Sequence, residues 1–162
     1  PSWGFSIKQG ATSIWERWDG WTPEKGFQDP GMNSFAHYSF GAVYQWMVEN
    51  IGGIRNDGVA YKTIVIAPQF TDRLASATTT YRSVRGPISV AWARAGGAAT
   101  MNVAIPPNTT ARIHVPAADP AAIVENGVAL AQAPGVKVVG VEGGATVVEV
   151  GSGTYAFQFA AP

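Results

Sequence analysis

The chain of 162 residues contains no cysteine. This absence excludes a disulfide framework and a thiolate metal site, but it does not separate cytoplasmic from secreted proteins, so the compartment is left open. The 11 basic and 11 acidic residues cancel, and the basic residues form no cluster. Nucleic acids and anionic membrane surfaces both require such a cluster, and no apolar run is long enough to span a bilayer. We therefore expect no nucleic acid and no membrane among the partners of this protein.

Motifs for cofactor chemistry are missing as well. His114 has no second histidine, cysteine or acid at ligand spacing, which argues against a metal site and favours a surface position on a strand. The glycine-rich segment 140–144 lacks the Lys-Ser/Thr pair of a phosphate loop, and no Gly-x-Ser-x-Gly elbow for acyl transfer occurs. We expect neither a metal nor a cofactor.

The first 52 residues have a mainly helical pattern, within a chain that is 46% hydrophobic and can form a real core. A short helix is predicted over Trp3–Gln9, and Trp18–Gly31 is expected to be a long ordered loop. Asn33 or Ser34 is expected to cap a second helix, which ends at Gly52-Gly53. The apolar residues of this helix recur at helical spacing: Phe40, Val43, Met47 and Ile51.

The pattern after residue 60 is one of short β-branched runs separated by Gly, Pro and Asn. One run alternates Thr100, Asn102 and Ala104 with apolar residues, as in an antiparallel strand with one buried face. The pattern predicts an antiparallel β-sandwich over residues 56–162, preceded by a short helical segment over residues 1–55. The predicted strands are Lys62–Ala67, Leu74–Tyr81, Ile88–Arg94, Thr100–Ile105, Ala111–Val115, Val136–Val141, Thr146–Val150 and Tyr155–Phe159.

Aromatic residues and one carboxylate are concentrated near the start of the chain. Glu16 lies between Trp15 and Trp18, and Trp21 and His37 follow. Indole faces and an acid suit a polar but non-ionic ring, so a saccharide site is the first hypothesis. If residues 11–18 are extended, Glu16 and Trp18 share one face and Trp15 lies on the other. In the alternative interpretation the tryptophans belong to the core and Glu16 pairs with a surface arginine.

Several motifs closely resemble one known family. The segments TSIWERWDGW and PEKGFQDPGMNSFAHYSFGAV are similar to the C-terminal part of the catalytic domain of bacterial α-L-rhamnosidases, which are inverting glycoside hydrolases with an (α/α)6 barrel. The segments YKTIVIAPQ, IPPNTTA and GSGTYAF resemble the C-terminal β-sandwich of that family. Ala36 is a departure, because the family usually has Asn between Phe and His.

The resemblance implies a mechanism and a set of site residues. It implies that Glu16 is the general base, and that His37 contacts the substrate, a rhamnose-containing glycoside. A histidine at this position could instead be satisfied by a backbone carbonyl. Trp15, Trp18 and Trp21 are expected to form part of the wall of the sugar subsite, although at least one of them is expected to serve packing only. Asp19 is the loop acid close enough in sequence to share the pocket.

The resemblance also implies that the general acid comes from barrel segments that this sequence does not contain. The isolated chain is therefore expected to be inactive without the rest of the barrel. The alternative is a non-catalytic carbohydrate-binding or structural sandwich module derived from such an enzyme. The apolar stripe of the second helix is expected to be covered by the sandwich, by the rest of the barrel, or by a second copy exchanged about a Gly52-Gly53 hinge.

Overall fold

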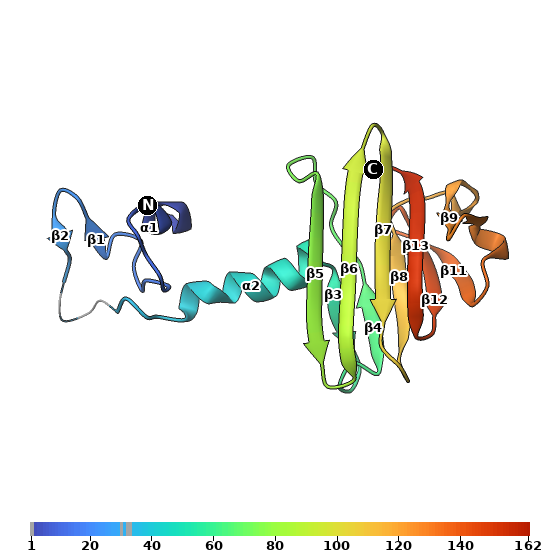
Figure 1. Cartoon of the computed structure of the whole chain (residues 1–162), viewed down its shortest axis with the longest axis horizontal. Helices are drawn as coiled ribbons and strands as arrows, with labels where there is room; N and C mark the ends of the chain where they lie inside the picture. The colour runs from blue at the N-terminus through green and yellow to red at the C-terminus, as the bar shows by residue number, and fades with distance from the viewer. Residues whose placement is uncertain (1, 30, 32–33) are drawn as a thin grey trace. The chain divides into compact units, whose positions relative to one another are not determined.

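The computed structural model describes residues 2–29, 31 and 34–162, and the chain divides into two compact units, Pro1–Trp46 and Met47–Pro162. Figure 1 shows the elements in chain order. The first unit contains helix α1 (Trp3–Lys8), strands β1 (Trp21–Thr22) and β2 (Gly26–Phe27), the 3-10 helix η1 (Ser39–Ala42) and helix α2 (Val43–Trp46). Among the described residues, no helix is both long and apolar enough to cross a membrane.

Helix α1 confirms the short helix predicted from the sequence. The hydroxyl of Ser2 accepts a hydrogen bond from the backbone N–H of Phe5, which satisfies one of the free donors of the first turn. The long loop is ordered by the two-residue ladder of β1 and β2, in which Trp21 pairs with Phe27.

The start of the second helix differs from the prediction. The helical residues begin at Ser39, with Tyr38 as the capping residue and no side-chain capping bond. Ser34 does not cap this helix, because it lies well before Tyr38 and its hydroxyl accepts the N–H of Ala36 instead. Asn33, the other predicted cap, and Met32 of the family motif lie outside the described residues.

The second unit begins with a π-helical turn, η2 (Met47–Ile51), and continues into strand β3 (Ile54–Asp57). Gly52 and Gly53 are both buried between them. A Cβ on Gly52 would lie 2.6 Å from the side chain of Thr79, and a Cβ on Gly53 would lie 2.1 Å from the backbone of Pro68. These glycines therefore form a closely packed turn, which does not fit the hinge that we expected here.

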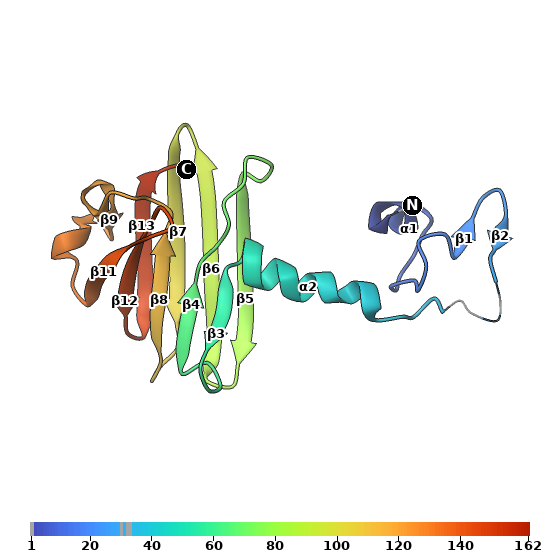
Figure 2. The same ribbon diagram turned by 180° about the vertical axis from the view of Figure 1, so that it is seen from behind.

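Two sheets form the β-sandwich of the second unit (Figures 1 and 2). The six-stranded sheet has the order β10-β9-β13-β7-β6-β5, and the five-stranded sheet has the order β11-β12-β8-β4-β3. Strand bounds after β3 are β4 Thr63–Ile66, β5 Ser76–Ser83, β6 Gly86–Ala95, β7 Ala98–Ile105, β8 Thr110–Val115, β9 Val124–Glu125, β10 Val128–Ala129, β11 Val136–Glu142, β12 Ala145–Val150 and β13 Gly153–Ala160. Two 3-10 turns, η3 (Pro120–Ala122) and η4 (Leu130–Gln132), lie between β8 and β11.

The sheets confirm a mainly β fold built from antiparallel strands, with one exception. Strand β4 pairs with β8 in parallel, because the chain between them forms β5, β6 and β7 of the opposite sheet. All eight strands predicted from the sequence are present. The prediction missed β3, β9 and β10, and Ile54 and Arg55, which we assigned to the helical segment, pair with β4.

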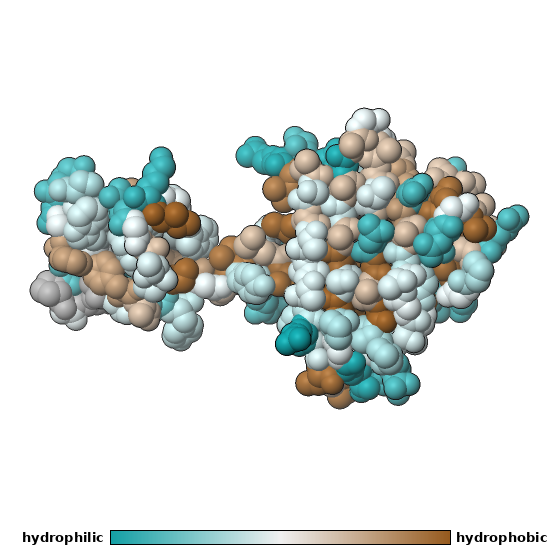
Figure 3. Space-filling model, viewed as in Figure 1, coloured by the Kyte–Doolittle hydropathy of each residue, from teal (hydrophilic) through white to brown (hydrophobic). Residues whose placement is uncertain are grey.

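The core lies between the two sheets and is formed by alternate residues of their strands. Ile88, Val90 and Trp92 of β6 face Ile64 and other apolar residues of the five-stranded sheet in one buried cluster. The residues between them point outward, and the surface over β5, β6 and β7 carries mainly neutral and hydrophilic side chains (Figure 3). This alternation is the physical basis of the period of two in the sequence.

Candidate functional site

The candidate site lies in the first unit, where two segments distant in sequence pair through their backbones. The N–H of Glu16 donates to the carbonyl of Ser34 over 2.8 Å, and the N–H of His37 donates to the carbonyl of Ile14, also over 2.8 Å. The hydroxyl of Ser13 donates to the carbonyl of Phe35. These contacts bring Glu16 and His37 together.

The carboxylate of Glu16 is held by a backbone donor and faces an imidazole. Its Oε2 accepts a hydrogen bond of 2.7 Å from the N–H of Ser34 and lies 4.0 Å from Nδ1 of His37. The Glu16 side chain is 24% exposed, so the carboxylate is fixed but still open to solvent. A charge-assisted bond to a backbone N–H fixes a carboxylate more firmly than a flexible surface ion pair does.

The surface-arginine alternative for Glu16 does not match the described contacts. Arg17, the adjacent arginine, forms a two-point interaction with Asp19, at 3.2 Å and 3.3 Å. Both side chains of this pair are nearly half exposed. Asp19 is therefore engaged at the surface of the loop.

Among the described residues, the ring of His37 contacts side chains and no backbone carbonyl. Its Nε2 lies 3.0 Å from Oγ of Ser39, and its Nδ1 faces Glu16. The ring of Tyr38 lies nearly parallel to it, at an interplanar angle of 6°. These contacts do not match the alternative in which a carbonyl satisfies the ring.

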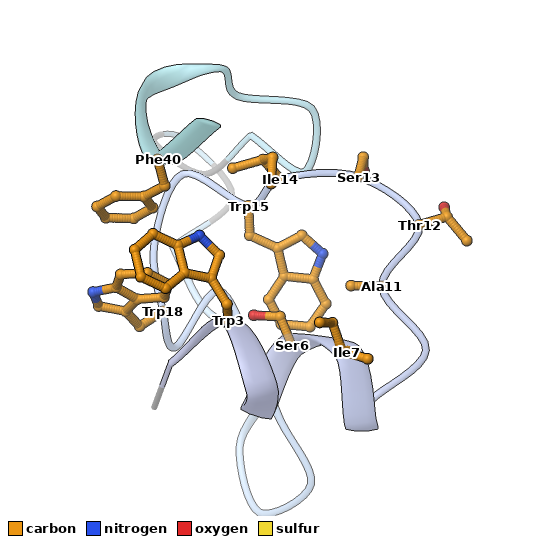
Figure 4. Close-up of a pocket in the computed structure, with 10 residues that line it drawn as sticks. All are labelled: Trp3, Ser6, Ile7, Ala11, Thr12, Ser13, Ile14, Trp15, Trp18 and Phe40. Carbon is orange, nitrogen blue, oxygen red and sulfur yellow. The ribbon is translucent and has the colours of Figure 1, made fainter. Parts of the chain in front are cut away.

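The tryptophans surround a separate aromatic pocket of about 300 Å³ (Figure 4). Trp18 stacks on Phe40 with 4.1 Å between ring centroids and meets Trp3 edge to face at 4.8 Å. Trp15 points into the same pocket and also meets Phe35 edge to face. The other lining residues are Ser6, Ile7, Ala11, Thr12, Ser13 and Ile14.

This pocket corrects the expectation that Trp15 and Trp18 lie on opposite faces. Residues 11–20 form no strand, so the period of two does not apply to them. Glu16, Asp19 and Trp21 are not among the residues that line the aromatic pocket. Of the predicted residues, Trp15 and Trp18 line the aromatic pocket, Glu16 and His37 form a pair, and Trp21 and Asp19 belong to neither group.

Sequence reasoning missed two contributors to these features. Phe40 was assigned only to the apolar stripe of a helix, yet it forms the stacked wall against Trp18. Ser39, in contact with His37, was not singled out, because a lone serine carries no spacing signal. No group of three or more His, Cys, Asp or Glu residues that could hold a metal ion occurs within the part of the chain that the structure describes.

Comparison with known protein families gives matches to both units. Residues 1–51 match the bacterial α-L-rhamnosidase six-hairpin glycosidase domain, and residues 53–130 match the bacterial α-L-rhamnosidase C-terminal domain. An α-L-rhamnosidase of Streptomyces avermitilis is 40% identical over 157 residues, which are 97% of this chain and 14% of that protein.

Solved structures show the same correspondence. The crystal structure of the Streptomyces avermitilis α-L-rhamnosidase, complexed with L-rhamnose, has a TM-score of 0.85 and covers 98% of this chain, at 40% identity. The structure of an α-L-rhamnosidase from Dictyoglumus thermophilum has a TM-score of 0.79 at 27% identity and covers 99% of this chain. The matched regions are 15% and 17% of those chains, respectively. The chain therefore belongs to the α-L-rhamnosidase family and corresponds to the C-terminal part of its members.

Proposed function

We propose that this chain is the C-terminal portion of an α-L-rhamnosidase, which removes terminal α-L-rhamnose from glycosides with inversion, and that Glu16 is the general base. Residues 1–55 then form the end of the barrel catalytic domain and residues 56–162 the sandwich domain. The observation that carries the proposal is the fixed, partly exposed carboxylate of Glu16 beside His37, in the unit that matches a glycosidase domain.

The geometry of Glu16 suits the activation of a water molecule. A general base must keep its lone pairs aimed at one place, and the 2.7 Å bond from the N–H of Ser34 restrains the carboxylate in this way. Nδ1 of His37 lies 4.0 Å from Oε2 of Glu16. A ring N–H of His37 can donate a hydrogen bond to a sugar hydroxyl or orient the carboxylate. A base role for Glu16 and a sugar contact by His37 both require that these two residues lie close to the same bound substrate.

Inversion requires a second carboxyl group, at roughly 6.5–9.5 Å from the base. The other acids of the first unit have surface or loop contacts: Asp19 pairs with Arg17, Asp29 accepts the N–H of Gly31, and Glu24 is exposed. We therefore assign the general acid to the part of the barrel that the relatives contain and this chain does not span. The isolated chain then lacks half of the acid-base pair.

The aromatic residues have a secondary part in the proposal. Trp15 and Trp18 line a pocket of suitable size for part of a sugar ring or for an apolar group of the aglycone. Trp21 and Asp19 lie outside this pocket, and their contact with the substrate stays a prediction. A rhamnose-containing glycoside and the rest of the barrel are then the two partners of this chain.

The test is a complementation assay. The missing barrel, expressed as a separate chain, is mixed with this chain, and cleavage of an aryl α-L-rhamnoside is followed. Activity that requires both chains and is lost with Glu16→Gln would support the proposal, and the anomer first formed, observed by NMR, tests inversion. Activity that is unchanged by Glu16→Gln would contradict the role of Glu16.

The alternative, a carbohydrate-binding module without catalysis, rests on the aromatic pocket. Indole walls bind sugar rings without any acid-base pair, so the chain alone would bind L-rhamnose. Calorimetric titration of the chain with L-rhamnose, repeated with Trp18→Ala, distinguishes this function. Binding that depends on Trp18, together with a complemented enzyme indifferent to Glu16→Gln, would favour the module.

A further inference from the structure

The ring of His37 lies between a hydroxyl and a carboxylate. Nε2 is 3.0 Å from Oγ of Ser39, and Nδ1 is 4.0 Å from Oε2 of Glu16. The backbone N–H of His37 donates a hydrogen bond to the carbonyl of Ile14, which fixes the backbone from which the side chain extends. The two ring nitrogens therefore have different neighbours.

Ser39 is the first residue of η1, and Tyr38 before it is the capping residue, so the hydroxyl of Ser39 is not needed as a cap. The hydroxyl of Ser39 contacts the imidazole instead. Its side chain is exposed, so no packing requirement explains this orientation.

The chemistry of the neighbours selects one tautomer of the neutral ring. A carboxylate only accepts hydrogen bonds, so the favourable arrangement places the proton of His37 on Nδ1, toward Glu16. Nε2 is then an acceptor and needs a donor, which the hydroxyl of Ser39 supplies. The opposite tautomer would aim the lone pair of Nδ1 at a negative charge.

We propose that Ser39 is a positioning residue that holds His37 in the Nδ1–H tautomer, so that the ring N–H is directed at Glu16. At 4.0 Å this N–H acts on the carboxylate as an oriented dipole rather than through a short hydrogen bond. Together with the N–H of Ser34, it keeps Oε2 in one direction. The catalytic consequence rests on the proposed function of Glu16, whereas the tautomer itself does not.

The tautomer can be measured in this chain without any activity assay. The chain has two histidines, so His114→Gln leaves His37 as the single imidazole in a long-range ¹H–¹⁵N NMR spectrum. At a pH where the ring is neutral, we expect Nδ1 to have the shift of a protonated nitrogen and Nε2 that of an unprotonated one. With Ser39→Ala the share of the Nδ1–H form should fall and both shifts should move toward each other, because Nε2 loses its donor while Glu16 still favours a proton on Nδ1.

Two further variants separate positioning from a general structural effect. Ser39→Thr keeps a hydroxyl and should restore the Nδ1–H tautomer. Ser34→Ala removes a nearby hydroxyl whose described partner is the N–H of Ala36, and should leave the tautomer of His37 unchanged. Unchanged far-ultraviolet circular dichroism shows that the variants fold alike.

Each outcome bears on one proposal at a time. Identical His37 shifts in the parent and Ser39→Ala would overturn the positioning role, whatever the complementation assay gives. A tautomer that depends on Ser39, in an enzyme whose rate does not depend on Glu16, would leave the positioning inference intact and refute the proposed base.

Discussion

The indole Nε1–H of Trp92 donates a hydrogen bond of 2.8 Å to the backbone carbonyl of Ile51. Trp92 is 2% exposed on β6, and Ile51 is the last residue of η2. Carbonyls at the end of a helical segment lack a partner within the segment, and a buried indole requires an acceptor. One bond therefore satisfies both groups and joins η2 to the six-stranded sheet.

Replacing Trp92 by Phe should destabilise the sandwich measurably. The variant keeps an aromatic ring but leaves the carbonyl of Ile51 without its donor, at a cost of about 1–3 kcal/mol plus lost packing. Urea unfolding gives the difference in the free energy of unfolding. Tyr155→Phe is the matched control, because it also removes one bond to a backbone carbonyl, that of Gly151, but at an exposed site. Equal decreases in the free energy of unfolding in the two variants would contradict the expectation that a buried hydrogen bond costs more to lose than an exposed one.

Alanine at Gly53 should be far more costly than alanine at Gly143. Both glycines have positive φ, 71° and 56°, so both variants incur backbone strain of about 1 kcal/mol. A Cβ at Gly53 would also meet the backbone of Pro68 at 2.1 Å, whereas a Cβ at Gly143 meets nothing within 4 Å. Thermal unfolding should therefore show a large loss for Gly53→Ala only. Similar melting temperatures for the two variants would show that the turn at Gly53 can shift to accommodate a Cβ without a large loss of stability.

The second unit should fold on its own if β3 is retained. Residues 47–162 include η2 and β3, and should unfold cooperatively with a β-rich circular dichroism spectrum. A chain that starts at Asp57 loses most of β3, including Ile54, which is 1% exposed and contributes about 1.5–3 kcal/mol by burial. We expect a lower melting temperature for the shorter chain. Equal stability of the two would show that β3 is dispensable.

Stability should fall in mildly acidic solution through His114. Burial, followed by the positive charges of Arg112 and Arg55, lowers the pKa of His114 below 6.5, and the opposing effect of Glu142 is smaller than that of burial. The unfolded chain then binds a proton that the folded chain resists, so stability decreases as the pH falls through the ordinary histidine range. Urea unfolding between pH 7.5 and about 5.5 measures this decrease.

The matched pair for this measurement is His114→Gln and His37→Gln. The first variant should lose part of the decrease in stability between these pH values, whereas the second should retain the contribution of His114. If the stability of His114→Gln and of the parent decreased by the same amount between these pH values, the decrease would come from groups other than His114.

On the proposed function, the chain alone should not cleave aryl α-L-rhamnosides, because the other described acids of the first unit, Asp19, Glu24 and Asp29, have surface or loop positions. Spectrophotometric assays at high protein concentration, with the complemented enzyme as the positive control, check this expectation. Turnover by the pure chain that disappears with Glu16→Gln would mean that a second acid is present and that the assignment of the acid to the barrel is wrong.

Local sequence patterns predicted most strands of the sandwich. Such patterns could not predict which strands pair with each other. Alternation over Thr100–Ile105 depends only on one face being buried, which is a local property of a strand. The parallel pairing of β4 with β8 depends on three intervening strands in the other sheet. Strand β3 was missed because only Ile54 among its four residues is buried.

The sequence by itself determined the family, the mainly β fold and the residues that could carry chemistry, since composition, periodicity and motifs are local. Tertiary structure alone decided which of those residues meet. Trp15 and Trp18 face one pocket while Glu16, between them, faces Ser34 and His37, because the chain near them is irregular and follows no fixed period. The direction of a side chain in such a segment is set by contacts with distant residues, here the pairing of residues 14–16 with residues 34–37.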